Sequence, residues 1–302
     1  MKNIFGVCKD NEEFDGKCFV VRTVNPILEE EINSHLETNE TLEKKASLPK
    51  ALKIIKLIAF YGALIIVIGI LKSLGDVSLK EAYGNAPFLF YIGGVLLLTF
   101  AVLKIYEANK HEDVAQSEEV KHLETESTEL LKNALLDLKV PEEAILVDVF
   151  SYGYKVKNGK EKQLTSFFQY INTEMHLFKE EDNLCLANAH EVYSIPISYI
   201  KSIKMINKKA TVFGWNKELA YNSPEYKKYK IAVNNYGTLF IKPYYSILIN
   251  NGFEDFELLV PSYDIDKFLN LTNLEIEKEE VTQYLLLLFK SIYLQGFKNL
   301  SR

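Results

Sequence analysis

Apolar residues form two long runs in the first third of the chain, Ile54–Leu71 and Ala82–Leu103, and the second run contains no charged residue. A bilayer core of about 30 Å is crossed by about 20 largely apolar helical residues. In the first run, Leu57–Leu71 lies between Lys56 and Lys72, whose long stems can reach the headgroups from near the ends of a span. The pattern therefore predicts a transmembrane hairpin with helices over 52–74 and 86–106.

Lysines surround this hairpin unevenly. They are frequent before the first run and after the second, whereas the connector over 75–85 has only Lys72 and Lys80 near it, offset by Asp76 and Glu81. Because positively charged residues flank spans on the cytoplasmic side, we expect both termini in the cytoplasm and a short extracytoplasmic connector. The location predicted is the inner (plasma) membrane, with a multi-pass topology.

Two polar or mixed segments flank the hairpin. Residues 1–50 are expected to be a polar cytoplasmic segment, ordered at best in part, with a helix near Pro26–Leu36. Residues 107–140 contain no Gly or Pro before the end of the segment and predict one helical stalk that ends at Pro141. A coiled coil between two copies is the sharper interpretation of the stalk, but Ser127 interrupts its seam, so a stalk packed on the next domain is favoured.

A β-rich domain is predicted over 142–272. Short runs rich in Ile, Val, Tyr and Phe are separated by turn residues, and Asn158-Gly159 is typical of a two-residue hairpin turn. A helix is expected over Pro261–Leu271. The fold class is thus α+β, with a small β-barrel or two orthogonal sheets capped by a helix. The expected strands are Val147–Lys157, Met175–Lys179, Leu184–Ala187, Glu191–Ile206, Tyr229–Asn234, Thr238–Ile241, Tyr245–Ile249 and Phe256–Val260.

The stretches Leu184–Asn188 and Val192–Ile203, followed by the later strands and the helix from Pro261, resemble the pleckstrin-homology-like (PH-like) domains of bacterial membrane proteins. The resemblance covers roughly 145–272 and is a pattern of strands and one helix. It implies a PH-like fold and a general binding role, and it carries over no functional residue. The basic residues that hold phosphoinositides in some relatives are represented here by Lys without Arg.

The last segment, 273–302, is predicted to be a C-terminal helix. Its first turns are acidic and its late positions are basic, as the helix dipole favours. Packing on the β domain is the plain interpretation, and a return to the membrane surface is the alternative.

Charge and chemistry exclude several function classes. The net charge is −6 and no region has a strong basic excess, which argues against nucleic acid as a partner. Three cysteines, Cys8, Cys18 and Cys185, do not form a disulfide framework and indicate a reduced compartment. The five histidines are scattered, and no catalytic or metal-binding motif stands out. We therefore expect no enzymatic activity, no cofactor and no metal.

Two surfaces are candidate contacts. Four lysines around the predicted turn could meet anionic headgroups, although lysines at a hairpin tip also serve solubility: Lys155, Lys157, Lys160 and Lys162. A second group could form a protein-partner patch, although the single Trp could equally lie in the core: Trp215, Tyr226, Lys227 and Lys228.

These features predict a membrane-anchored, non-enzymatic binding or scaffold protein. Its PH-like domain would be held near the lipid bilayer, where it would bind a protein partner or anionic headgroups, because tethering raises the effective concentration of a weak contact. The alternative is an accessory subunit of a membrane transport or secretion complex that works through its hairpin. The sequence leaves the partner and the oligomeric state open.

Overall fold

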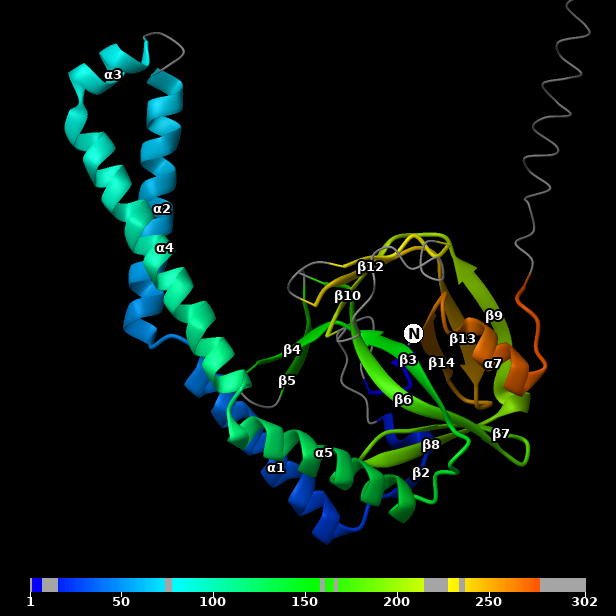
Figure 1. Cartoon of the computed structure of the whole chain (residues 1–302). Helices are drawn as coiled ribbons and strands as arrows, with labels where there is room; N and C mark the ends of the chain where they lie inside the picture. Colours follow the sequence, from blue (N-terminus) through cyan, green and yellow to red (C-terminus); the bar gives the residue numbers. More distant parts are fainter. Residues whose placement is uncertain are drawn as a thin grey trace, which may run out of the picture. The chain divides into compact units, whose positions relative to one another are not determined.

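The computed structural model describes residues 2–6, 16–73, 78–157, 161–165, 168–214, 228–233 and 237–277. These residues form an α+β structure with two long apolar helices and a largely antiparallel sheet (Figure 1). The chain divides into two compact units. We call Pro26–Asn133 the helical unit, and Met1–Asn25 together with Ala134–Arg302 the sheet unit.

The helical unit is built around an antiparallel pair, α2 and α4, which lie side by side (Figure 1). Both are long and apolar enough to cross a membrane, as the sequence predicts. Pro87 occupies the first turn of α4, where a missing backbone donor is tolerated. The helices of this part of the chain are α1 (Pro26–Ala46), α2 (Lys50–Ser73), α3 (Leu79–Asn85), α4 (Pro87–Ala115) and α5 (Glu118–Asp137).

The structure corrects two expectations for this part of the chain. The predicted stalk over 107–140 is not one helix, because α4 continues to Ala115 and α5 starts anew at Glu118. Ser117 causes the restart: its hydroxyl accepts a hydrogen bond from the Val120 N–H at 3.3 Å, as a helix N-cap does. The helix expected near Pro26–Leu36 is present but longer than expected, since α1 extends to Ala46 and has 21 residues.

Within the helical unit, α5 runs antiparallel to α1. The His35 ring Nε2 lies 3.0 Å from the Leu123 carbonyl oxygen, and Lys45 pairs with Glu119 at 3.2 Å. Lys110, near the end of α4, donates to the Ser47 carbonyl just after α1. These contacts join the end of the hairpin where α2 begins and α4 ends to the α1/α5 pair.

The sheet unit contains strands from both ends of its sequence. Residues expected to form a loose N-terminal segment instead supply β1 (Lys2–Asn3), which pairs with β14, and β2 (Val20–Thr23), which pairs with β8. All pairings in the large sheet are antiparallel except β1–β14 and β10–β6. The other strands of this sheet are β3 (Ile145–Tyr152), β6 (Tyr170–Glu180), β7 (Asn183–Ala187), β8 (Glu191–Pro196), β9 (Ile200–Ile206), β10 (Ala210–Phe213), β11 (Ala232–Val233), β12 (Leu239–Ile241), β13 (Tyr244–Asn250) and β14 (Asp255–Pro261).

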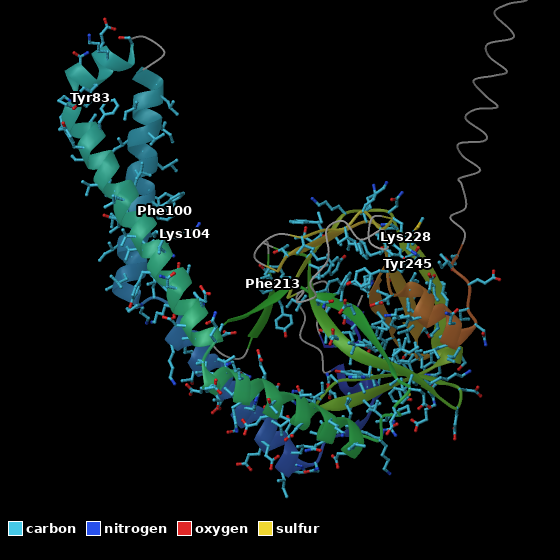
Figure 2. All side chains as sticks on the ribbon, viewed as in Figure 1. Tyr83, Phe100, Lys104, Phe213, Lys228 and Tyr245 are labelled. Carbon is cyan, nitrogen blue, oxygen red and sulfur yellow. The ribbon has the colours of Figure 1, made fainter. Side chains whose placement is uncertain are left out.

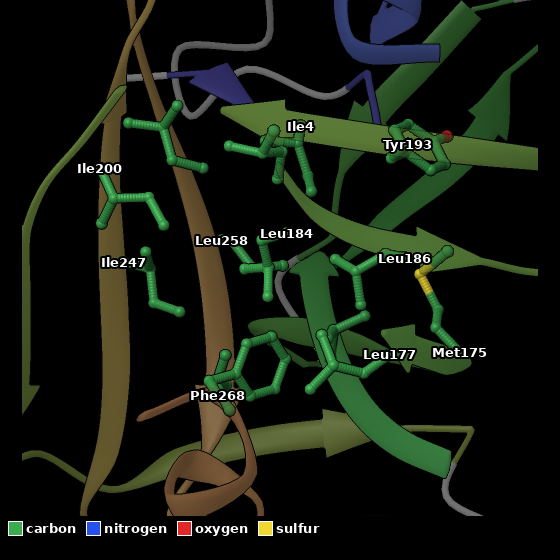
Figure 3. Close-up of a cluster of buried hydrophobic side chains, with 14 of the residues drawn as sticks. Ile4, Met175, Leu177, Leu184, Leu186, Tyr193, Ile200, Ile247, Leu258 and Phe268 are labelled. Carbon is green, nitrogen blue, oxygen red and sulfur yellow. The ribbon is translucent and has the colours of Figure 1, made fainter. Parts of the chain in front are cut away.

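Two hydrophobic clusters fill opposite faces of the central strands. Along β14, Phe256 and Leu258 enter the first cluster while Leu259 enters the second, which is the alternation of a strand buried on both sides. The first cluster also takes Ile4 from the N-terminal segment and Phe268 from α7 (Ile265–Thr272) (Figure 3). The N-terminal residues are therefore part of the core.

Several strand boundaries differ from the sequence prediction. The expected strand Glu191–Ile206 divides into β8 and β9 around a short 3-10 turn, Ile197–Tyr199. The expected strand Val147–Lys157 divides at Gly153, where a Cβ would lie only 2.5 Å from the Phe168 carbonyl oxygen. Only glycine allows this approach. Strand β10 was not predicted at all.

The end of the described chain contradicts the start of the predicted C-terminal helix. Ile276 forms a parallel bridge with Ile203 of β9, and the Glu277 N–H donates to the Ile203 carbonyl at 2.9 Å. Residues 275–277 are therefore extended along the sheet edge rather than helical. The remainder of the predicted helix, 278–302, lies outside the described residues.

Candidate functional site

The α2/α4 hairpin exposes most of its apolar side chains. Only 11% of the most apolar stretch of α2 and 6% of that of α4 is buried. Figure 2 shows side chains projecting outward along both helices. Large side chains at mid-helix are among the most exposed in the chain, with Ile65 at 70% and Leu98 at 68%. A core helix of a soluble protein would be mostly covered, so this surface is of the kind that contacts lipid or another protein.

Small residues set the contact between the two helices. Ala59, Ala63 and Gly93 are buried at this contact. A Cβ on Gly62 would lie 2.9 Å from Leu96 Cδ1, and one on Gly93 would lie 3.1 Å from Ile66 Cγ2. Close approach through small residues is how helices associate in lipid.

An ion pair joins the helices at the end of the hairpin that continues into α1 and α5. Lys56 of α2 lies 2.5 Å from Glu107 of α4, and both side chains are about three-quarters buried, with 26% and 23% exposure. Lys56 was expected to extend toward headgroups. Its ammonium is instead neutralised by a carboxylate from the other helix, which lowers the cost of placing the charge close to the apolar run.

The predicted lysine hairpin exists as a strand pair. Strands β4 (Tyr154–Lys157) and β5 (Glu161–Leu164) pair in register, with Lys157 opposite Glu161 and Val156 opposite Lys162. Lys155 and Lys157 alternate with Val156, so the register places these two lysine positions on one face and Lys162 on the other. Residues 158–160, with the predicted turn and Lys160, lie outside the described residues.

The predicted partner patch falls almost entirely outside the described part of the chain. Trp215, Tyr226 and Lys227 belong to 215–227, which the structure does not describe. Lys228 is described: its ammonium lies 4.4 Å from the centroid of the neighbouring Tyr229 ring, a cation–π contact. The partner patch therefore stays a prediction.

Sequence reasoning missed a buried polar cluster in the sheet unit. Asp148 of β3 is fully buried and accepts hydrogen bonds from the Tyr263 hydroxyl at 2.7 Å and the Asn172 amide at 3.0 Å. The buried carboxylate of Glu257 accepts hydrogen bonds from the hydroxyls of Tyr152 and Ser246. These carboxylates tie β3, β6, β13 and β14 together, and their hydrogen bonds offset the cost of burial. An acidic residue between two buried valines was the only available signal.

Tyrosines next to this cluster are held in a low-polarity setting. Tyr170 stacks near Phe150 and shares a hydrogen bond with Tyr244, with 2.9 Å between the two hydroxyl oxygens. Burial, assisted by this contact, raises the pKa of Tyr170 well above its usual range. Tyr170 therefore keeps its hydroxyl proton well into the alkaline range.

The cysteine thiols differ in environment. Cys185 is buried in β7, and burial raises the pKa of its thiol. Cys18 is exposed. In the described ranges, no group of three or more metal-ligating side chains is close enough together to hold a metal ion.

A groove of about 770 Å³ lies between α1 and α5 in the helical unit. Its lining is acidic and apolar, and it was not anticipated from the sequence. The lining residues are Ile27, Glu30, Glu31, Ser34, His35, Thr38, Leu123, Glu126, Glu129, Leu130 and Asn133.

Comparison of the chain with protein-family models, with curated proteins and with solved structures finds no match.

Proposed function

We propose that the protein is an integral membrane protein of the inner (plasma) membrane that anchors a cytoplasmic binding domain. In this proposal α2 and α4 cross the bilayer as a hairpin, and the sheet unit is held at the cytoplasmic face. The observation that carries the proposal is the exposed apolar surface of α2 and α4.

The size of this surface supports lipid as its environment. Fully burying one large aliphatic or aromatic side chain is worth roughly 1.5–3 kcal/mol. The exposed apolar side chains extend from Ile54 to Leu71 on α2 and from Phe88 to Tyr106 on α4. Their outward surface is continuous over nearly the whole hairpin, which matches a lipid-facing surface better than a local docking patch.

The orientation with both termini inside is proposed from lysine placement. Lysines cluster at the end of the hairpin that joins α1 and α5, whereas the connector end has only Lys72 and Lys80, offset by Asp76 and Glu81. A single cysteine at Lys80, in a chain with Cys8→Ser and Cys18→Ser, should react with an impermeant maleimide on intact cells. A cysteine at Lys139 should react only after permeabilisation; the opposite pattern would reverse the orientation.

The binding role is proposed from the PH-like resemblance. A largely antiparallel sheet with one helix, α7, packed into its core supports that resemblance. Headgroups or a protein could be bound, and the lysines of the β4/β5 hairpin are the proposed headgroup contacts. Changing Lys155, Lys157, Lys160 and Lys162 to Gln should weaken the binding of the full chain to added anionic vesicles at low salt, as measured by vesicle flotation. Unchanged binding would reject these lysines as the contact.

The membrane proposal is tested by alkaline carbonate extraction of native membranes. The intact chain should stay in the pellet, as integral proteins do. Release of the intact chain into the supernatant would contradict the proposal.

A second candidate function uses the same exposed surface: the hairpin could contact the spans of a transport or secretion complex. A photo-crosslinker at Leu98 would then capture a membrane protein, whereas one at Phe253, which is 93% exposed in the sheet unit, would not. Capture at Phe253 alone would favour the anchored binding domain.

A further inference from the structure

The groove between α1 and α5 has the geometry of a helix-binding site. Its lining positions on α1 are spaced by three and four residues, from Ile27 through Glu30, Glu31 and Ser34 to Thr38. Those on α5 follow the same spacing, from Leu123 to Asn133. Two such faces directed into one groove form the seam that a third helix fills in a helical bundle.

The length of the groove sets the size of the occupant. Ile27 and Thr38 are about 16 Å apart along the axis of α1 at 1.5 Å per residue. This is about three helical turns. The lining is kept together by His35, whose ring nitrogens lie 3.0 Å from the Leu123 carbonyl and 3.2 Å from the Asn39 amide.

The chemistry of the lining selects the occupant further. Ile27, Leu123 and Leu130 supply apolar contacts, and four glutamates supply negative charge without any lysine or arginine in the lining: Glu30, Glu31, Glu126 and Glu129. An occupant must therefore combine an apolar stripe with basic flanks.

Charge also argues against two other occupants. Helix α1 has six glutamates and two lysines, and α5 has five glutamates, one aspartate and two lysines. An anionic lipid surface would be repelled by this pair. A second copy of the chain would bring the same acidic face to the groove, and like charges facing each other weaken association.

We infer that this groove binds a basic amphipathic helix of about three turns, provided by a partner protein. Apolar residues of the partner at i, i+3, i+4 and i+7 contact the floor, and its lysines or arginines meet the four glutamates. This inference does not depend on the membrane proposal, because the groove lies entirely within α1 and α5.

The test uses the full chain in nanodiscs of zwitterionic lipid and a fluorescent 14-residue peptide of leucine and lysine with leucines at helical i, i+3, i+4 and i+7 spacing. Fluorescence anisotropy measures binding, and empty nanodiscs give the lipid background. The peptide should bind, and two matched peptides should not: one with Glu in place of Lys, and one with the same composition and scrambled spacing.

Two charge variants locate the site. Changing Glu30, Glu31, Glu126 and Glu129 to Gln should weaken binding at least about tenfold, since four charge pairs each contribute modestly. Changing four glutamates of the same helices that do not line the groove should weaken binding less than about threefold: Glu37, Glu43, Glu118 and Glu124. Equal losses in the two variants, or no binding of the Leu/Lys peptide, would overturn the inference.

A neutral variant separates the groove from general electrostatics. Ser34 is exposed in the lining, so Ser34→Trp should fill the groove without disturbing the fold and should also weaken binding about tenfold. Unchanged peptide binding in Ser34→Trp would overturn the inference. If light scattering shows that the starting chain is a dimer and that Ser34→Trp is a monomer, the groove binds a second copy. That result would overturn the inference as well.

Discussion

The two units of this chain use similar apolar residues in opposite ways. In the sheet unit, Ile247, Leu258 and Phe268 are at most 1% exposed, whereas Ile65 and Leu98 of the helical unit are about 70% exposed. The sheet unit closes its own core, and the α2/α4 hairpin does not. Hydrophobic composition alone thus does not predict which side chains are buried. The length of an uninterrupted apolar helix is a better guide, because apolar segments in a soluble core are usually shorter than a membrane span.

The energetics of the two units differ accordingly. The sheet unit is stabilised by two clusters and by the hydrogen-bonded carboxylates Asp148 and Glu257. The hairpin is held by contacts of small residues and by the Lys56–Glu107 pair. Changes in the sheet unit should therefore act through cavities, and changes in the hairpin through overcrowding or loss of charge pairing.

The largest effect is expected in the sheet core. Phe268→Ala should lower the free energy of unfolding of the sheet unit by about 3–5 kcal/mol, because it leaves a cavity in the first cluster. Hydrogen exchange of β13 and β14 amides in the full chain measures it. Phe253→Ala is the matched control, since Phe253 is 93% exposed, and a similar loss in both variants would break the contrast between core and surface.

The next effect tests the hairpin contact. Gly93→Leu should destabilise the α2/α4 association by about 1–3 kcal/mol, because Ile66 already lies where the added side chain would go. Gly94→Leu, with open space around its Cβ position, should have little effect. Spin-label distances between α2 and α4 in bilayers report the separation, and equal separation in both variants would mean that the helices do not pack as described.

A smaller effect is expected for the charge pair. Glu107→Ala leaves the Lys56 ammonium without this carboxylate and should destabilise the hairpin by about 1–2 kcal/mol. Glu40→Ala removes the exposed Lys44–Glu40 pair and should change stability by less than about 0.5 kcal/mol. Thermal unfolding of both variants in one detergent compares their stabilities. An equal loss of stability in the two variants would show that the burial of the Lys56–Glu107 pair has no energetic consequence.

The smallest effect is a pH dependence of the sheet unit. Partial burial lowers the pKa of His176, opposed by Glu174. The unfolded chain then binds a proton at higher pH than the folded one, so stability should be greater above pH of about 6.5 and should fall as the pH drops toward the folded pKa. Replacing His176 by Gln should flatten this part of the stability–pH curve, and an unchanged slope would assign it to other groups.

The helical hairpin could be predicted from the sequence because its signal is local. Both apolar runs follow from residue type and spacing, and they coincide with α2 and α4. Which glycines touch the neighbouring helix depends on rotation about the axis. Gly93 is at the contact, whereas the adjacent Gly94 has open space around its Cβ position.

The sheet unit was less predictable because its pairings are long-range. Ile4 and Phe19 join the core from a segment that has little apolar character of its own. The groove was missed because neither α1 nor α5 has an unusual sequence, and its lining arises only when the two helices lie antiparallel. The restart at Ser117 was visible in principle as a serine followed by two glutamates, a typical helix start.

The most direct test of the account places a spin label at Leu98, in the middle of α4, with the chain reconstituted in bilayers. If lipid surrounds the hairpin, oxygen should reach the label readily while a water-soluble nickel chelate should not, and a label at Leu36 of α1 should show the reverse preference. If the nickel chelate reaches Leu98 as readily as it reaches Leu36, water rather than lipid surrounds the hairpin, and the central claim is contradicted.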